Sequence, residues 1–407
     1  MTYCLTAPTN LQGHIDLPAS KSLSNRALIL SALTQGAGKL TNLSDCDDTR
    51  VMIEALQAGK HDLNIGAAGT AMRFLTAYLS LQPGQWTLTG TERMKNRPIS
   101  LLVEALRSLG ASIEYLEKEG YPPLVINGGS LQGGTITIDG GISSQYLSAL
   151  MMVGPRMNKG LTLTIKGTLI SQPYARMTLR MMTAYGINAT WQDNQIILPA
   201  GAYRAIDYHV EADWSAASYW YELLSLAPSG ELILHALEAD SLQGDAAIVN
   251  YFKPLGVATT WIEGGVRLTK TKVETSRFEA DLSNQPDLAQ TLAVTCAALD
   301  IPFCLKGLGS LKIKETDRIA ALLTEAAKLG YVFEETPANG LSWTGKRCTP
   351  EAEPVIATYE DHRMALSFAP FAFKQKGLKI AHPAVVSKSY PAFWNALEAV
   401  GFSVEHL

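Results

Sequence analysis

The chain has 407 residues, which is enough for two or three domains with sizeable cores. It carries 34 basic and 38 acidic residues, so the formal net charge is -4 and the basic excess of most nucleic-acid-binding proteins is absent. Charged residues make up only 18% of the sequence, against about 25% in an average domain. Each cluster of charges therefore calls for its own explanation.

The cysteines and the apolar runs indicate a soluble protein of a reducing compartment. The five cysteines are scattered and include no C-x-x-C pair, which is unlike a disulfide framework. The first 20 residues contain no Lys or Arg and no long apolar block, so we expect neither a signal nor a transit peptide. Every apolar run is far shorter than the ~20 residues that span a bilayer. We expect a cytoplasmic protein with no membrane or nucleic-acid partner.

A helical pattern that ends in Gly and leads into a β-rich segment recurs along the chain. Its glycines are Gly59, in a weaker copy, Gly110, Gly186, Gly256, Gly330 and Gly401, and from Gly110 onward they lie 70 to 76 residues apart. Gly suits a helix end whose next residue needs a positive φ. Polar turns between alternating segments, as in residues 189–199 and 259–270, predict a hairpin in these units. We expect six α/β or α+β units in two groups of three, divided near Glu211–Ser215.

Seven short segments gather Lys, Arg and hydroxyl side chains near predicted helix starts. In chain order they are residues 18–26, 66–73, 93–98, 141–146, 312–318, 360–364 and 386–391. Free backbone N–H groups, the positive end of the helix dipole and Lys or Arg side chains all favour a bound anion at such a place. The densest charge run, residues 312–318, also holds Lys and Glu side chains that can move a proton.

Each segment alone has an ordinary structural explanation, such as a helix cap, backbone packing or a solvated charge run. Residues 340–346 match the phosphate-loop pattern G-x-x-x-x-G-K, but Arg347 stands where that loop needs Ser or Thr, and a hairpin is predicted there. The seven histidines show no metal-ligand spacing. No G-x-G-x-x-G follows a strand, so a dinucleotide-binding fold is not indicated either.

Seven such helix starts in a chain with few charges favour a single site for anions. Its cations come from both halves of the sequence: Lys21, Arg97, Lys314, Arg318, Arg363 and Lys388. A cleft between two domains that binds phosphates or carboxylates fits this distribution best.

The ordered set of motifs PASKSLSNRALILSAL, AGTAMR, RMKNRPI, SSQYLSAL, IKETDRI, EDHRMALSFA and VSKSYPAFW resembles the 3-phosphoshikimate 1-carboxyvinyltransferase (EPSP synthase) family of enolpyruvyl transferases. The resemblance runs from about Pro18 to Trp394. It implies an α/β (α+β) fold of two similar domains, each of three βαβαββ units forming an inside-out α/β barrel, with a substrate cleft between them. We place the N-terminal domain at residues 18–212 and the C-terminal domain at 1–17 plus 213–407.

The family transfers the enolpyruvyl group of phosphoenolpyruvate to the 5-hydroxyl of shikimate 3-phosphate. The resemblance implies these two small-molecule partners, no cofactor, no metal and a monomer. The residues implied to bind shikimate 3-phosphate are Lys21, Ser22, Arg26, Ser143, Ser144, Gln145, Ser171, Tyr174, Asp287, Ser310 and Lys314. Those implied to bind phosphoenolpyruvate are Lys21, Gly69, Arg97, Gln145, Arg318, Arg363 and Lys388.

Four residues are implied to take part in proton transfer. Asp287 resembles the carboxylate that accepts the proton of the 5-hydroxyl group. Lys21, Glu315 and His362 are the other candidates, and either Lys21 or Glu315 protonates the methylene carbon. Because the substrates are multiply charged anions, the Lys and Arg side chains also supply the electrostatic field.

The sequence departs from the usual family pattern at three places. The glycine-rich turn reads Ala67-Ala68-Gly69-Thr70 where Asn usually precedes the Ala-Gly-Thr run, Phe74 replaces a usual Pro, and Ser310 stands where Asn often binds substrate. These changes bear on local contacts. Because Gly69 is retained, we expect inhibition by glyphosate, a mimic of phosphoenolpyruvate.

Two other functions remain as alternatives. A related enzyme of the same fold uses UDP-N-acetylglucosamine, but it usually carries a reactive Cys in the loop that corresponds to residues 92–97, where this chain has none. A binding protein without catalysis is disfavoured because Lys21, Asp287 and Glu315 are all present. Cations from two halves repel each other when the site is empty, so we also expect an open cleft that closes on ligand.

Overall fold

The computed structural model describes residues 1–36, 38–57, 59–141, 143–337 and 339–407. Two compact units make up the chain: Met1–Pro18 together with Glu211–Leu407, and Ala19–Val210. The chain leaves the first unit after residue 18 and returns to it at residue 211, so the first unit is discontinuous in sequence.

The unit Ala19–Val210 shows its repeating module clearly in residues 62–128. Its elements are β5 (Asp62–Asn64), α3 (Gly69–Leu79), β6 (Gly84–Thr89), α5 (Ser100–Ser108), β7 (Ser112–Tyr115) and β8 (Leu124–Gly128). β5 pairs with β6 in parallel, and β8 lies antiparallel between β6 and β7, which gives the order β5-β6-β8-β7. This is a βαβαββ unit: a crossover through one helix, a second helix and a closing hairpin.

The rest of this unit repeats the module. β9 (Gly134–Asp139), α6 (Ser144–Val153), β10 (Leu161–Lys166), α7 (Gln172–Ala184), β11 (Thr190–Gln192) and β12 (Gln195–Leu198) form the next sheet, in the order β11-β12-β10-β9. A reduced copy contains α1 (Lys21–Ala32) and α2 (Asp47–Leu56). Its strands β3 (Thr34–Gln35) and β4 (Leu40–Thr41) pair in parallel with β13 (Tyr203–Arg204) and β14 (Tyr208–His209), so the two ends of the unit meet.

The unit of residues 1–18 and 211–407 contains the same module. The first copy is β2 (Leu11–Asp16), α8 (Trp214–Leu226), β15 (Gly230–His235), α9 (Ile248–Phe252), β16 (Val257–Ile262) and β17 (Gly265–Lys270). The second is β18 (Phe278–Asp281), α10 (Ala289–Ala298), β19 (Phe303–Lys306), α11 (Arg318–Lys328), β20 (Glu334–Thr336) and β21 (Gly340–Trp343). The third is β22 (Val355–Ile356), α12 (His362–Phe368), β23 (Leu378–Ala381), α13 (Phe393–Ala399), β24 (Ser403–His406) and β1 (Thr2–Thr6).

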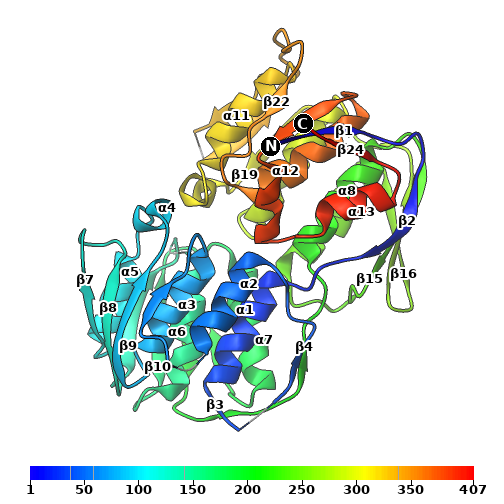
Figure 1. The fold of residues 1–407 in the computed structure, drawn as a ribbon. Helices are drawn as coiled ribbons and strands as arrows, with labels where there is room; N and C mark the ends of the chain where they lie inside the picture. Colours follow the sequence, from blue (N-terminus) through cyan, green and yellow to red (C-terminus); the bar gives the residue numbers. More distant parts are fainter. Residues whose placement is uncertain (37, 58, 142, 338) are drawn as a thin grey trace. The chain divides into compact units, whose positions relative to one another are not determined.

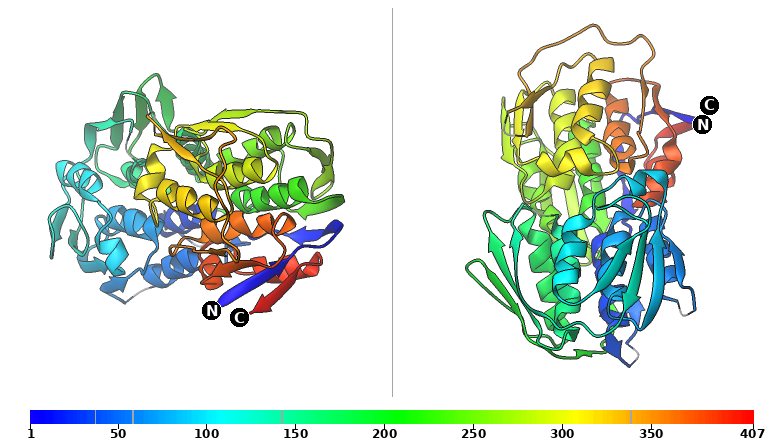
Figure 2. Two further views of the ribbon diagram at one scale, coloured as in Figure 1. Left: turned by 90° about the horizontal axis from the view of Figure 1, so that it is seen from above. Right: turned by 90° about the vertical axis from the view of Figure 1, so that its left-hand side faces the viewer.

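The last sheet is closed by the N-terminal strand. Its order is β22-β23-β1-β24, so β1 takes the place that the second hairpin strand holds in the other modules. Tyr3 of β1 lies opposite His406 of β24, and their rings stack with centroids 4.3 Å apart. Both views of Figure 2 show the two chain ends next to each other as a result.

The first helix of each module forms the core of its unit. All but one of the 13 residues of α8 are buried, as are all ten residues of α10 and all seven of α12. Because these helices are buried on nearly every side, they pack against one another as well as against the sheets. In the other unit α3 packs on both α1 and α6, and Figure 1 shows these helices side by side with β7 to β10 along one flank.

The predicted mixed α/β class and the repeated module are confirmed. All six repeat glycines have positive φ, between 88° and 104°, and each follows the second helix of a module. From the sequence, the basic segment 93–98 predicts a helix that has Pro98 in its first turn. That prediction is wrong, because α5 begins at Ser100 and Ile99 is its cap. Among the described residues, no helix has the length and apolar character needed to span a bilayer.

Candidate active site

The predicted site residues collect at the starts of the core helices. In the unit Ala19–Val210, α1 begins at Lys21, α3 at Gly69 and α6 at Ser144. In the other unit, α12 begins at His362, and Asp287 lies in the short helix η3 (Pro286–Leu288) just before α10. Repetition of one module places these starts at equivalent positions, so each unit gathers free N–H groups and positive helix ends.

Lys21 opens α1, which Ser20 caps by accepting from the Leu23 N–H at 3.5 Å. The Lys21 Nζ lies 3.5 Å from Asp48 Oδ2 at the start of α2, and both side chains are largely buried. The Lys21 ammonium thus lies at the start of α1 with a carboxylate beside it.

Arg26 lies deeper along α1 and is almost fully buried. Its Nε donates to Thr178 Oγ1 at 2.8 Å, its Nη1 to the Ser22 carbonyl at 2.8 Å and its Nη2 to Ser148 Oγ at 2.9 Å. Burial lowers the pKa of Arg26 to about 10. All three guanidinium nitrogens bind protein groups, so Arg26 joins α1 to α6 and α7.

Two aromatic rings flank the Arg26 guanidinium. Its Cζ lies 5.3 Å from the ring centroid of Phe74 and 5.8 Å from that of Tyr174. Phe74, one of the departures from the family pattern, is therefore buried against Arg26 within α3.

The glycine-rich turn and the basic loop meet at Arg97. A Cβ atom at Gly69 would lie 2.6 Å from Arg97 Nη1, so only glycine lets the guanidinium approach the start of α3. Arg97 is 7% exposed, and its Nε has no hydrogen-bond partner among the described residues. A buried, incompletely bonded guanidinium beside a helix N-terminus is a place for an anion.

Arg73 fixes the geometry of that place. Its Nη1 donates to the Gly69 carbonyl at 3.2 Å, and its Nη2 donates to the Pro98 carbonyl at 3.2 Å. The Tyr146 hydroxyl also donates to the Pro98 carbonyl. The first turn of α3 and the basic loop are thus tied together by α3 and α6.

The remaining predicted residues of this unit lie at two further helix starts. Ser143 caps α6 by accepting from the Gln145 N–H at 3.3 Å, and Gln145 Nε2 donates to Thr70 Oγ1 at 3.2 Å, which ties α6 to the glycine-rich turn. Ile142, within the same motif, lies outside the described residues. Ser171 precedes α7 with a left-handed φ of 53° and is 6% exposed. Ala68 gives α3 no side-chain cap.

Asp287 is the centre of a cation cluster in the other unit. Its Oδ2 lies 3.0 Å from Arg363 Nη2, and its Oδ1 lies 3.1 Å from Arg318 Nη1 and 3.9 Å from Lys314 Nζ. Burial by itself would raise the pKa of the Asp287 carboxyl, but Arg363, Lys314 and Arg318 outweigh it and hold that pKa well below its ordinary value. Burial lowers the pKa of Lys314, and Asp287 opposes that shift.

Arg318 connects three carboxylates. Its Nε donates to Asp361 Oδ2 at 2.7 Å and its Nη2 to Glu315 Oε2 at 3.0 Å, in addition to the Asp287 contact. The second oxygen of Glu315 lies 3.2 Å from Lys388 Nζ in η6 (Pro383–Lys388). Burial opposes the charge of Arg318, but Asp361, Glu315 and Asp287 together raise its pKa.

His362 and Arg363 are aimed by a constrained turn. Tyr359 and Glu360 both have left-handed φ values, 52° and 56°, which non-glycine residues adopt rarely and at a cost. Asp361 then caps α12 by accepting from the Arg363 N–H at 2.9 Å. The turn is held from α11 by the fully buried Glu325, which accepts from the Tyr359 hydroxyl at 2.6 Å and the Ala357 N–H at 2.9 Å.

Of the predicted residues in this unit, the cluster contains Asp287, Lys314, Glu315, Arg318, Arg363 and Lys388. His362 is next to it, with Nδ1 3.7 Å from Asp361 Oδ1. Ser310 lies in η4 (Gly309–Ile313), which packs on α11 and directly precedes Lys314. No group of three or more His, Cys, Asp or Glu side chains in the described part of the chain is arranged to hold a metal ion.

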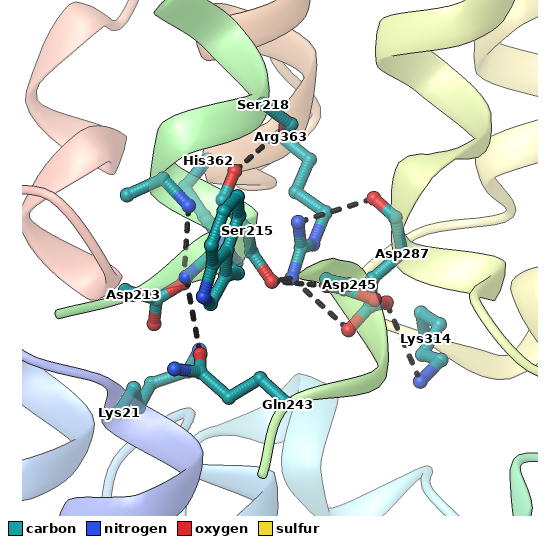
Figure 3. A network of polar contacts seen from close by, with 12 residues as sticks. Lys21, Asp213, Ser215, Ser218, Gln243, Asp245, Asp287, Lys314, His362 and Arg363 are labelled. Carbon is teal, nitrogen blue, oxygen red and sulfur yellow. Dashed lines mark hydrogen bonds and ion pairs between the residues drawn. The ribbon is translucent and has the colours of Figure 1, made fainter. Parts of the chain in front are cut away.

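Sequence reasoning missed several residues that shape these sites. Asp361, Ser215, Tyr219 and Asp245 all surround Arg318 or Arg363, as Figure 3 shows in part. Asp213 and Ser215 stand at a helix start just as the predicted residues do, so the pattern EADWSAAS could have revealed them. Asp245 and Tyr219 carry no such signal, because only the folded chain brings them to Arg363.

The architecture has a known counterpart. A solved structure described as EPSP synthase from Acinetobacter baumannii matches with a TM-score of 0.77 and 21% identity, and all of both chains is covered. At that identity the match establishes the fold. The chain is thus an α/β protein of this fold with cations at the starts of its core helices.

Sequence comparison establishes the family. A family model described as EPSP synthase (3-phosphoshikimate 1-carboxyvinyltransferase) matches residues 5–62 and 57–397. The 3-phosphoshikimate 1-carboxyvinyltransferase of Bacteroides fragilis (strain YCH46) is 52% identical over 406 residues, which cover 100% of this chain and 99% of the relative. That of Aliivibrio fischeri (strain MJ11) is 38% identical over 419 residues, covering 96% and 97%. The chain belongs to the EPSP synthase family.

Proposed function

We propose that the helix starts described above bind the two substrates of the family reaction and move its protons. The chain is a 3-phosphoshikimate 1-carboxyvinyltransferase of the shikimate pathway. It transfers the enolpyruvyl group of phosphoenolpyruvate to the 5-hydroxyl of shikimate 3-phosphate and releases phosphate. The proposal concerns which residues do this work.

One observation supports the assignment most strongly: Asp287 is surrounded by Arg363, Arg318 and Lys314. In this state the carboxylate serves as their counter-ion and is a poor base. An arriving phosphate or carboxylate group competes for the same cations, which weakens their hold on Asp287 and raises its pKa. Phosphoenolpyruvate binding therefore prepares Asp287 to accept the proton of the 5-hydroxyl group.

The proton balance of the reaction follows from this arrangement. The 5-hydroxyl oxygen bonds to C2 of phosphoenolpyruvate as Asp287 takes its proton, while a second group protonates the C3 methylene carbon. The resulting tetrahedral intermediate loses phosphate as a proton leaves C3, which restores the enol double bond. In the addition, Asp287 is the base and the second group is the acid. In the elimination, the second group takes back its proton from C3, and protonated Asp287 gives its proton to the leaving phosphate.

The proton for C3 is assigned to Lys21. Both carboxylate oxygens of Glu315 are engaged by cations, one by Arg318 and the other by Lys388. Lys21 at the start of α1, whose Nζ lies 3.5 Å from Asp48 Oδ2, is the other candidate and takes this role in the proposal. In this assignment Glu315 orients Arg318 and Lys388. His362, beside Asp361, remains a further candidate for proton transfer.

The binding assignments divide between the two units. Shikimate 3-phosphate is bound mainly by hydroxyl and amide groups of Ala19–Val210, namely those of Ser22, Ser143, Ser144, Gln145 and Ser171. Arg26 and Tyr174 complete this set. Phosphoenolpyruvate is bound by Gly69 and Arg97 and by Arg318, Arg363 and Lys388. Lys21 contacts both substrates, and Lys314 and Ser310 contact shikimate 3-phosphate.

The proposal requires the two units to act on one pair of substrates, so we also propose that the chain closes on them. It works as a cytoplasmic monomer. Small-angle scattering should show a smaller radius of gyration with both substrates than without, and identical profiles would contradict closure.

The reaction itself is tested by phosphate release. Purified chain is expected to release phosphate from phosphoenolpyruvate with shikimate 3-phosphate and not with UDP-N-acetylglucosamine. No release with the former would reject the function, and release only with the latter would favour the related enzyme. Glyphosate should inhibit competitively with phosphoenolpyruvate, because Gly69 leaves the Arg97 guanidinium in place.

A further inference from the structure

A buried carboxyl group that the mechanism does not use lies beside Arg363. Asp245 is in η2 (Gly244–Ala247), and it is 4% exposed. Its Oδ2 accepts a hydrogen bond from Ser215 Oγ, and Ser215 Oγ lies 3.5 Å from Arg363 Nη2. Figure 3 shows the Ser215 hydroxyl next to both the guanidinium and Asp245. The Ser215 hydroxyl therefore links Asp245 to Arg363 through hydrogen bonds.

Arg363 already has a carboxylate partner, Asp287. Asp287 Oδ2 lies 3.0 Å from its Nη2, while its Nη1 donates to the Asp287 carbonyl at 3.1 Å and to the Tyr219 hydroxyl at 3.2 Å. A second ionised carboxyl group in the same pocket would thus share a single guanidinium. Asp245 Oδ1 is buried and has no hydrogen-bond partner among the described residues, which penalises its ionised form.

The charged and titratable groups around Asp245 come from four elements. They are Asp213 at the cap of α8, Asp287 in η3, Arg363 in α12 and Tyr251 in α9. Burial raises the pKa of Asp245 to about 7, with a further rise from Asp287 and an opposing effect of Arg363. The carboxyl group is therefore neutral below about pH 7 and ionised above it.

We propose that Asp245 is a positioning residue for Arg363 that acts through Ser215 and sets how strongly this site holds an anion. When neutral, it leaves the charge of Arg363 to Asp287 and to the substrate. When ionised, it adds a negative charge that repels phosphoenolpyruvate. Conversely, a bound anion favours the neutral form, so Asp245 takes a proton from solvent as phosphoenolpyruvate binds. This inference rests on the proposed role of Arg363.

The test compares the KM for phosphoenolpyruvate from pH 6 to pH 9 in the unaltered chain and in Asp245→Asn. The amide of the variant still accepts from Ser215 but never ionises. The ratio of the two KM values cancels the titration of the substrate itself. We expect the KM of the unaltered chain divided by that of Asp245→Asn to be near 1 at pH 6. At pH 9 this ratio should rise to about 5 or more, which approaches the tenfold change that one pKa unit represents.

Asp240→Asn is the matched control, because it removes one negative charge from an exposed residue nearby and should give a flat ratio. If Asp245→Asn gives a ratio that does not change with pH, Asp245 has only a structural role and the inference is wrong. Ser215→Ala keeps the Asp245 carboxyl group but removes the hydrogen-bond donor that stabilises its ionised form. The pH at which KM for phosphoenolpyruvate begins to rise should therefore be higher in this variant. If the midpoint of the rise in KM with pH is unchanged or lower in Ser215→Ala, the inference is also wrong.

These outcomes are separate from the test of the function. If the unaltered chain does not turn over phosphoenolpyruvate with shikimate 3-phosphate at pH 6, the proposed function fails and the pH comparison cannot begin. If it does turn over, the KM ratios test Asp245 alone.

Discussion

The two units build similar modules but balance charge differently at their helix starts. In residues 1–18 and 211–407, the cations face carboxylates: Arg318 contacts Asp287, Glu315 and Asp361. In Ala19–Val210, the buried Arg26 and Arg73 side chains face neutral groups: Arg26 binds two hydroxyls and a carbonyl, and Arg73 binds two carbonyls. Lys21, which lies beside Asp48, is an exception in that unit. One module thus supports two kinds of site.

This difference indicates a division of labour. A cluster in which every cation has a carboxylate nearby can exchange a counter-ion for a substrate and change the basicity of that carboxylate. A set of hydroxyls, amides and carbonyls cannot do this, but it holds a hydroxylated ring and its phosphate by many directional bonds. We therefore expect proton transfer to involve mainly side chains of residues 1–18 and 211–407, with Lys21 as the exception.

The largest effect is expected from Asp287→Asn. The amide cannot take the proton of the 5-hydroxyl, so kcat should fall by about 100-fold or more. KM for phosphoenolpyruvate should not rise, because the cations around residue 287 lose their competitor. Steady-state kinetics with Asp281→Asn as a control tests this, since Asp281 is an exposed carboxylate bonded to Ser283. An unchanged kcat would remove Asp287 from its role.

Gly69→Ala tests the site in the unit Ala19–Val210. The added Cβ would meet Arg97 Nη1 at 2.6 Å and must displace the guanidinium, so KM for phosphoenolpyruvate should rise by about 10-fold, which corresponds to about 1.4 kcal/mol. Gly129→Ala is the control, because a Cβ there meets nothing within 4 Å. Equal kinetics for the two variants would contradict the close approach of Arg97 to the turn.

Glu325→Gln tests the support of the charged cluster from behind. The variant weakens the bonds to Tyr359 and Ala357 that hold the left-handed turn, and it breaks the 2.8 Å ion pair with Lys328. We expect a loss of about 1–3 kcal/mol in the free energy of unfolding, measured with urea. Glu351→Gln, at an exposed carboxylate, should lose much less. Equal losses would show that the turn does not depend on Glu325.

The smallest effect is a pH dependence of stability. The pKa of Asp287 is lower in the folded chain than in the unfolded one, so its ionised form stabilises the fold above about pH 4, and that contribution is lost as the pH falls further. The difference in unfolding free energy between the unaltered chain and Asp287→Asn should therefore shrink from pH 6 to pH 3. A difference that grows in acid would reverse the assigned direction.

Much of the fold was predictable because it depends on local signals. The six glycines need positive φ whatever surrounds them, and their spacing gave the number of modules. Helix starts were equally readable, since Ser20, Ser143 and Asp361 are caps that act within a few residues. Proline placement was less reliable: Pro98 resembles a first-turn residue, but the short helix α4 (Glu92–Lys95) occupies the preceding segment.

The partners of the site residues were not predictable in the same way. Arg318 and Asp361 are 43 residues apart, and Arg26 and Thr178 are 152 apart, so no local pattern connects them. The sequence also gives no sign that the three guanidinium nitrogens of Arg26 bind groups of α1, α6 and α7. Asp245 belongs to a short turn with no basic residue beside it, and its importance comes only from Ser215 and Arg363.

The pairing of β1 with β23 and β24 bears on the order of events during synthesis. The unit Ala19–Val210 is one continuous stretch and can fold before the rest of the chain has been synthesised. The other unit waits until residues 403–406 emerge to meet a strand made first. A circular permutant that joins the two ends and opens at an exposed loop should fold, whereas deletion of β1 should leave β23 and β24 without the strand between them.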